Sequence, residues 1–234
     1  MKQTVKWLAA ALIALGLNQA VWADNMPDFQ KTLQAAKQGN VDAQYNLGVM
    51  YAIGQDVPQD DAQAVQWYRK AAEQGDAQAQ VNLGLMYEQG QGVRQDYAEA
   101  FRWYRKAAEQ GLVQAQTNLG NGYAQGQGVR QDYAQAVQWY RRAAEQGNAD
   151  AQVNLGLMYA NGQGVRQDDA QAVQWYRQTA EQGDAQAQVL LGIAYESGRG
   201  VRQDLALAQE WYGKACDNGD QIGCNNYLRL KLGY

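Results

Sequence analysis

The stretch DAQAQVNLGLMYEQGQGVRQDYAEAFRWYRKAAEQG, residues 76–111, determines the fold of this chain because close variants of it recur along the sequence. Its Trp103 has counterparts at intervals of 36 residues, at Trp67, Trp139, Trp175 and Trp211. The triplet Asn82-Leu83-Gly84 recurs at the same interval. A fixed period of this length predicts a solenoid, in which no unit buries its apolar face alone.

Each repeat has the sequence signals of two helices. Asp96 is expected to cap the N-terminus of the second helix, with Glu99 three residues later in a capping-box arrangement. Gly111 is expected to end that helix in a left-handed conformation. The first helix is expected to begin at Asp76 and to stop at Gly90-Gln91-Gly92. Loops this short predict antiparallel packing of the two helices.

The first repeat departs from this pattern in its loop, Gly54-Gln55-Asp56-Val57-Pro58, which lacks the second glycine. A differently shaped turn is expected there.

The period divides the chain into five repeats with half-repeats at the ends. The repeats are predicted at residues 40–75, 76–111, 112–147, 148–183 and 184–219, after an N-terminal capping half-repeat (24–39) and before a C-terminal capping helix (220–234). The sequence therefore predicts an all-α fold, an α/α superhelical solenoid of helical hairpins. Both ends replace core residues by polar ones, as terminal caps do: Lys31, Thr32, Arg229 and Lys231.

Residues 1–23 have the order of a secretory signal peptide. Lys2 and Lys6 precede an apolar run from Trp7 to Leu17, and Val21-Trp22-Ala23 offers a cleavage site. A transmembrane anchor is the alternative, but this run is far shorter than the roughly 20 residues that a spanning helix needs. We expect cleavage after Ala23 and a periplasmic or secreted protein without a stable membrane anchor.

Composition and charge argue against several functions. Loss of the two leader lysines changes the formal net charge from −4 to −6, and an acidic chain is unsuited to nucleic acid. The chain has no histidine, which excludes a His-dependent catalytic triad and a His-ligated zinc site. Its one serine, Ser197, is followed three residues later by Gly200, whereas serine β-lactamase chemistry needs Lys there. No enzyme activity, cofactor or metal is expected.

The repeat closely resembles the Sel1-like repeat, a relative of the tetratricopeptide repeat. The resemblance rests on residues 75–87, on the Gly90-Gln91-Gly92-Val93 loop, and on Asp96 with the run Trp103 to Ala108. It covers nearly all of residues 28–234. It implies an adaptor that holds other proteins, and exported bacterial members of the family often act at the envelope or in contact with host cells.

Two cysteines distinguish the last hairpin. Cys216 stands where earlier repeats have alanine, and Cys224 stands where Gln80 does, so the two are expected to face each other across the hairpin. In an oxidising compartment this pair should form a disulfide; the redox-active alternative lacks a Cys-x-x-Cys motif. The spacing is similar to that of cysteine-rich secreted Sel1-like proteins, several of which are classed as penicillin-binding or β-lactamase-like. That similarity implies an alternative function, binding of β-lactams or peptidoglycan fragments.

The resemblance implies that the first helix of each repeat lines a concave wall. The candidate peptide-binding residues on that helix form an asparagine ladder and an apolar series: Asn46, Asn82, Asn118 and Asn154, with Val49, Leu85, Leu157 and Ile193. Asparagine donates and accepts at once, which suits the backbone of an extended peptide. The alternative is that the ladder only bonds neighbouring repeats. The expected partner is a protein or peptide of the envelope or of a host cell; a spacer without a ligand is the remaining alternative.

Overall fold

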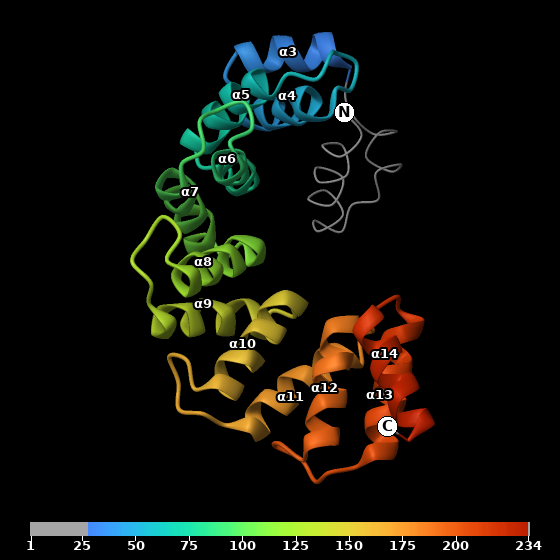
Figure 1. Ribbon diagram of the computed structural model, residues 1–234. Coiled ribbons are helices and arrows are strands. Elements are labelled where there is room, and N and C mark those ends of the chain that lie inside the picture. Colours follow the sequence, from blue (N-terminus) through green and yellow to red (C-terminus); the bar gives the residue numbers. More distant parts are fainter. Residues whose placement is uncertain (1–27, 234) are drawn as a thin grey trace. The chain divides into compact units, whose positions relative to one another are not determined.

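The computed structural model describes residues 28–233, and this part of the chain folds into α-helices without strands (Figure 1). The helices are α3 (Phe29–Lys37), α4 (Val41–Ile53), α5 (Asp61–Glu73), α6 (Ala77–Gln89), α7 (Tyr97–Glu109), α8 (Val113–Gln125), α9 (Tyr133–Glu145), α10 (Ala149–Asn161), α11 (Asp169–Ala180), α12 (Ala185–Ser197), α13 (Leu205–Asp217) and α14 (Gln221–Leu232). The expected signal peptide, residues 1–23, lies outside the described residues.

The chain divides into two compact units, residues 1–112 and 113–234. In the first unit α3 packs against α4, α4 pairs with α5, and α6 pairs with α7. In the second unit the hairpins are α8–α9, α10–α11 and α12–α13, and α14 packs against α13. Within each unit successive hairpins stack in sequence order, which confirms the expected all-α solenoid. We call the first helix of each hairpin helix A and the second helix B; α14 is of type A and α3 of type B.

Helix B begins at the aspartate that the sequence predicts as its N-cap, but the capping box is only half formed. Asp96 accepts hydrogen bonds from the backbone N–H groups of Ala98 and Glu99. The backbone N–H of Asp96 donates to the carbonyl oxygen of Tyr87, and the Glu99 carboxylate binds Arg102 at 2.6 Å instead. In each hairpin the backbone N–H of the N-cap donates to helix A. This hydrogen bond takes the place of the second bond of a capping box, in which the same N–H would donate to the side chain three residues later.

The loop of the first hairpin has the same shape as the others, so the expectation of a different turn is wrong. Gly54 and Asp56 have φ angles of 72° and 59°, close to the 68° and 65° of Gly90 and Gly92. Aspartate is among the residues that adopt the left-handed region most often. A Cβ on Gly92 would lie 2.2 Å from the backbone of Asp61 in the preceding hairpin. Asp61 is the first residue of α5, and its counterpart one repeat earlier, residue 25, lies outside the described residues.

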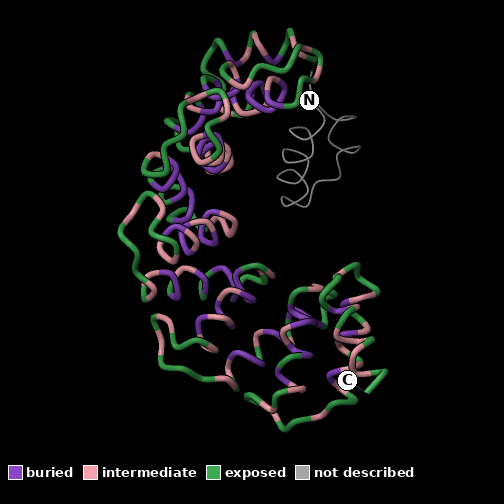
Figure 2. The backbone as a smooth tube through the Cα atoms, viewed as in Figure 1, coloured by how far each residue is buried: buried purple, intermediate pink, exposed green. Residues whose placement is uncertain are grey.

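A glycine in each helix A receives the tyrosine ring of its helix B. A Cβ added to Gly84 would lie 2.5 Å from the ring of Tyr104, and the equivalent pairs are equally close. These pairs are Gly48–Tyr68, Gly120–Tyr140, Gly156–Tyr176 and Gly192–Tyr212. Leu83 and Tyr104 are buried in the resulting core, and Figure 2 shows that buried residues recur along the helices. Glycine at this position therefore lets the two helices of a hairpin approach closely.

Within each unit, buried glutamines that the sequence analysis did not single out tie helix B to the following helix A. The side-chain amide of Gln80 donates to the carbonyl oxygen of Ala72 at 3.1 Å. Its oxygen accepts from the Gln110 side chain at 2.9 Å. Gln44, Gln152 and Gln188 make the same bond to Ala36, Ala144 and Ala180. The signal for this ladder was present in the sequence as a glutamine that recurs with the repeat.

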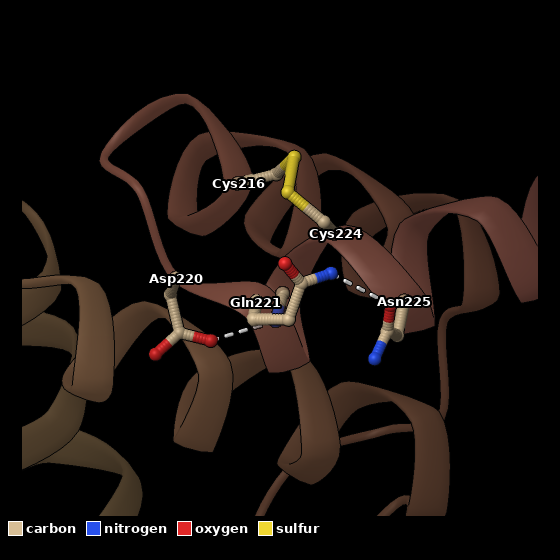
Figure 3. Close-up of a disulfide and its surroundings, with 6 residues drawn as sticks. Cys216, Asp220, Gln221, Cys224 and Asn225 are labelled. Carbon is tan, nitrogen blue, oxygen red and sulfur yellow. Dashed lines mark hydrogen bonds between the residues drawn. A yellow bond between two sulfur atoms is a disulfide. The ribbon is translucent and has the colours of Figure 1, made fainter.

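In the last hairpin a disulfide replaces this hydrogen bond (Figure 3). Cys216 stands at the position of Ala72 and Cys224 at that of Gln80. The two sulfurs are bonded, and the Cα atoms lie 4.4 Å apart. The expected disulfide is confirmed, and it fixes α14 to α13 covalently.

Helix α8 has the weakest local signals of the A helices. Leu112 stands where Asp or Asn caps the others, and Gly122 lies inside the helix. A lost cap and an interior glycine each cost about 1 kcal/mol. We expect residues 113–125 to exchange amide hydrogens faster than residues 149–161 of α10, as measured by mass spectrometry. Leu112→Asp should reduce the difference, and equal protection in the unmodified protein would contradict the prediction.

Candidate peptide-binding face

The candidate binding residues lie at two positions of the A helices that recur once per hairpin. The first unit contributes Asn46 and Val49 from α4 and Asn82 and Leu85 from α6. The second unit contributes Asn118 from α8, Asn154 and Leu157 from α10, and Ile193 from α12. We call the second unit's residues of this set, Asn118, Asn154, Leu157 and Ile193, the helix-A face.

Two of the asparagines hold neighbouring hairpins together. Asn82 is half-buried and hydrogen-bonds to the hydroxyls of Tyr45 and Tyr68 in the preceding hairpin. Burial raises the pKa of the Tyr45 hydroxyl to about 12, and the hydrogen bond with Asn82 opposes this shift. In the second unit Asn154 Nδ2 lies 3.4 Å from Asn121 Oδ1 of the preceding hairpin. These contacts support the alternative in which the ladder holds the stack.

Asn118 retains unused hydrogen-bonding capacity. Its Oδ1 accepts from Gln114 Nε2 at 3.1 Å, but its buried Nδ2 has no partner among the residues that the structure describes. A buried donor without a partner is unfavourable by about 1–3 kcal/mol. Because this Nδ2 atom is itself buried, it offers no contact to a ligand on the surface of the face.

The apolar positions differ in exposure, and the expectation that Val49 faces a ligand is wrong. Val49 is 1% exposed and belongs to a buried cluster with Leu83 of α6, so the next hairpin covers it. At the same helix position Leu85 and Leu157 are half-buried, and Ile193 is 44% exposed. Three of the four apolar candidates therefore reach the surface.

Acidic side chains flank the face, and an arginine that the sequence analysis did not place there neutralises one of them. Glu196 of α12 accepts from the Tyr212 hydroxyl at 2.8 Å and from Arg229 Nη2 at 2.6 Å. Burial disfavours the ionised form, but the hydrogen bonds from Arg229 and Tyr212 outweigh it and lower the pKa of Glu196. Partial desolvation and the nearby Asp184 carboxylate raise the pKa of Asp150 on α10. The acidic character of the second unit's face therefore rests on Asp150 more than on Glu196.

The helix-A face has side chains suited to binding another molecule, but no evident reactive group. The Ser197 hydroxyl donates to the carbonyl oxygen of Ile193 at 2.7 Å, and the chain has no histidine to activate it. Within residues 28–233 there is no group of three or more Asp, Glu or Cys side chains that could hold a metal ion. In the same range none of the helices has the length and apolar character required to cross a bilayer.

Comparison with known proteins gives a family match over most of the chain. The model of the Sel1 repeat matches five times, at residues 41–76, 77–112, 113–148, 149–184 and 185–220. No catalytic family is among the matches. No curated protein matches the chain.

Two solved structures are similar to the chain over nearly its whole length. One is a protective antigen present in uropathogenic Escherichia coli strains, described as displaying an SLR fold, with a TM-score of 0.85 and 39% identity. The match covers 99% of this chain and 52% of the antigen, so the chain spans about half of that protein. The other is a Sel1 repeat protein from Oxalobacter formigenes, with a TM-score of 0.81, 40% identity and coverage of 92% and 88%.

Proposed function

Because this chain belongs to the Sel1 repeat family, we propose that it is an exported adaptor that holds an extended segment of another protein on its helix-A face. The family fold is typical of protein-interaction scaffolds, and stacked repeats provide extended binding surfaces. The adaptor acts in the bacterial envelope or at the interface with a host.

The observation that carries the proposal is the exposure of apolar side chains on the A helices of the second unit. Ile193 is 44% exposed and Leu157 is half-buried at the same helix position. An extended segment would place apolar side chains against Leu157 and Ile193. In the first unit Leu85 offers the same kind of contact.

Charge favours a neutral or mildly basic segment. Asp150 on α10 is exposed, and no ion pair with it is found in the described part of the chain. The whole chain carries a formal net charge of −4. A basic segment would be attracted by the Asp150 carboxylate and by the negative net charge. Complementary charge mainly raises the association rate and the specificity of binding.

Export is supported by the leader and by the disulfide. Residues 1–23 have the sequence of a signal peptide, and disulfides such as Cys216–Cys224 persist in oxidising compartments. The description of the E. coli neighbour as a protective antigen fits a protein that meets a host. Since this chain spans about half of that antigen, the host role is part of the proposal.

The proposal is tested by capture from an envelope extract with residues 24–234, followed by affinity measurement with the captured protein. Leu157→Asp combined with Ile193→Asp should weaken binding at least tenfold, about 1.4 kcal/mol, because charges would replace the apolar contacts. Leu205→Asp is the matched control, since Leu205 is 52% exposed on α13 and aspartate stands at the same position in Asp61 and Asp169. Unchanged affinity of the double variant, with its circular dichroism intact, would rule out this face.

A further inference from the structure

The open end of the second unit carries a groove that is separate from the helix-A face. A cavity of about 530 Å³ lies along α13 and is lined by Ala206, Gln209, Glu210, Gly213, Lys214, Cys216, Asp217 and, from α14, Tyr227. On α14, Leu228 and Leu232 are 51% and 66% exposed. We call this cavity with the two leucines the end groove.

In the first hairpin the corresponding groove is filled by a tryptophan. Trp67 of α5 belongs to a buried cluster that includes residues of α3 and α4, namely Phe29, Ala36 and Leu47. Five repeats later the counterparts of these three residues are Gln209, Cys216 and Tyr227. All three line the cavity. The cavity is therefore the place that a tryptophan occupies at the start of the stack.

The same packing recurs in three other hairpins. Trp103, Trp175 and Trp211 each belong to a cluster with the counterparts of these residues, two from the preceding helix B and one from helix A of the same hairpin. Trp211 is the last tryptophan of the chain. Among the described residues, no tryptophan fills the end groove, although the residues that line it stand at the same repeat positions as those around Trp67.

The exposed leucines of α14 occupy positions that helix B covers in the other hairpins. Leu228 stands at the position of Gly192, which receives the ring of Tyr212. Leu232 stands at the position of Glu196, which accepts from the Tyr212 hydroxyl. The outer face of a terminal repeat is expected to be polar. Two neighbouring leucines exposed there, next to a cavity, are typical of an interaction surface.

We propose that the end groove docks an amphipathic helix of a partner protein, which inserts a tryptophan side chain into the cavity and packs its apolar side on Leu228 and Leu232. The docked helix would take the place that helix B has in the other hairpins. The Cys216–Cys224 disulfide replaces an alanine–glutamine pair at this groove, and sulfur makes favourable contacts with aromatic rings. Binding of an amphipathic helix through a few anchors is a common mode of recognition.

The charges around the groove are balanced, since Lys231 Nζ lies 5.4 Å from the ring of Tyr227, a lining residue. Lys214 pairs with Glu210 at 2.6 Å and lies 4.0 Å from the ring of Trp211. Asp217 has no ion-pair partner among residues 28–233. The chain's own B helices indicate the pattern of the partner instead. Four of the five tryptophan-bearing B helices, all but α11, carry a cation one turn after the tryptophan, as Lys106 shows, 4.2 Å from the ring of Trp103. The partner helix is therefore expected to have a Trp-x-x-Lys or Trp-x-x-Arg pattern.

The probe for this site is a fluorescein-labelled peptide with the sequence of residues 95–111, titrated into residues 24–234 and followed by fluorescence anisotropy. It contains Trp103 and Lys106. A lactam-stapled version is titrated in parallel, because peptides of this length are marginally helical in water. We expect saturable binding that weakens at least tenfold when Trp103→Ala is introduced into the peptide. Failure of both versions to saturate below about 1 mM would overturn the proposal.

Variants of the protein locate the binding. Leu228→Glu combined with Leu232→Glu should weaken binding at least tenfold, and both positions are exposed enough to accept the change. Leu205→Asp, an exposed leucine of the same hairpin outside the groove, should bind like the unmodified protein. The Leu157→Asp/Ile193→Asp protein should also bind normally, which separates this site from the helix-A face. Equal binding to the Leu228→Glu/Leu232→Glu protein would mean that the peptide lies elsewhere, and the proposal would be wrong.

Discussion

Replacing Gly84 by valine should destabilise the protein by about 2–3 kcal/mol, the usual cost of overpacking a core. A Cβ at residue 84 would lie 2.5 Å from the ring of Tyr104. That ring is 4% exposed, and its hydroxyl donates to the Glu88 carboxylate, so it cannot move aside without losing contacts. Urea denaturation followed by far-UV circular dichroism measures the loss.

The matched control is Gly213→Ala, at another glycine within a helix. A Cβ there would lie 3.3 Å from the ring of Tyr227, which borders a cavity and has room to shift. Alanine is favoured over glycine in a helix by about 1 kcal/mol. The control should be as stable as the unmodified protein or slightly more stable. If Gly84→Val were equally tolerated, the contact between glycine and tyrosine would not determine the hairpin geometry.

Cys216→Ala should remove about 2–3 kcal/mol of stability, the loop-closure entropy of so short a disulfide-linked segment. Alanine is the residue at this position in the other hairpins, so no steric penalty accompanies the change. The effect should be local, because stability in a solenoid is a sum of repeat and interface terms. Hydrogen exchange should accelerate over residues 221–232 and remain unchanged over α10.

Two outcomes would contradict this account of the disulfide. Titratable thiols in denatured, unreduced protein would show that Cys216 and Cys224 are not paired. Equal acceleration of exchange in α10 and α14 would show that the disulfide stabilises the second unit as a whole rather than its end.

The sequence was sufficient to predict the helices because local and repeated signals agree. Asp96 caps helix B as expected, and Gly111 adopts a φ of 91° at its end. The conformation of Asp56 was not predicted, because most repeats have glycine at this position and aspartate was not recognised as a residue that adopts the same left-handed conformation.

Exposure on the candidate face could not be read from the repeat position. Val49 and Ile193 share that position, yet they are 1% and 44% exposed, because burial depends on the side chains that the next hairpin supplies. The pairing of Arg229 with Glu196 depends in the same way on how α14 lies against α12. The sequence also predicted polar ends, and Leu228 and Leu232 depart from that pattern.

The central claim, that the helix-A face contacts another protein, is tested most directly by site-specific photocrosslinking in cells that produce and export the chain. Benzoylphenylalanine at position 193, in place of the exposed Ile193 of α12, should give a discrete covalent adduct with an envelope or host protein. The same group at position 174, in place of Gln174 on the exposed side of α11, should give none. No adduct at 193, or the same adduct from both positions, would contradict the account.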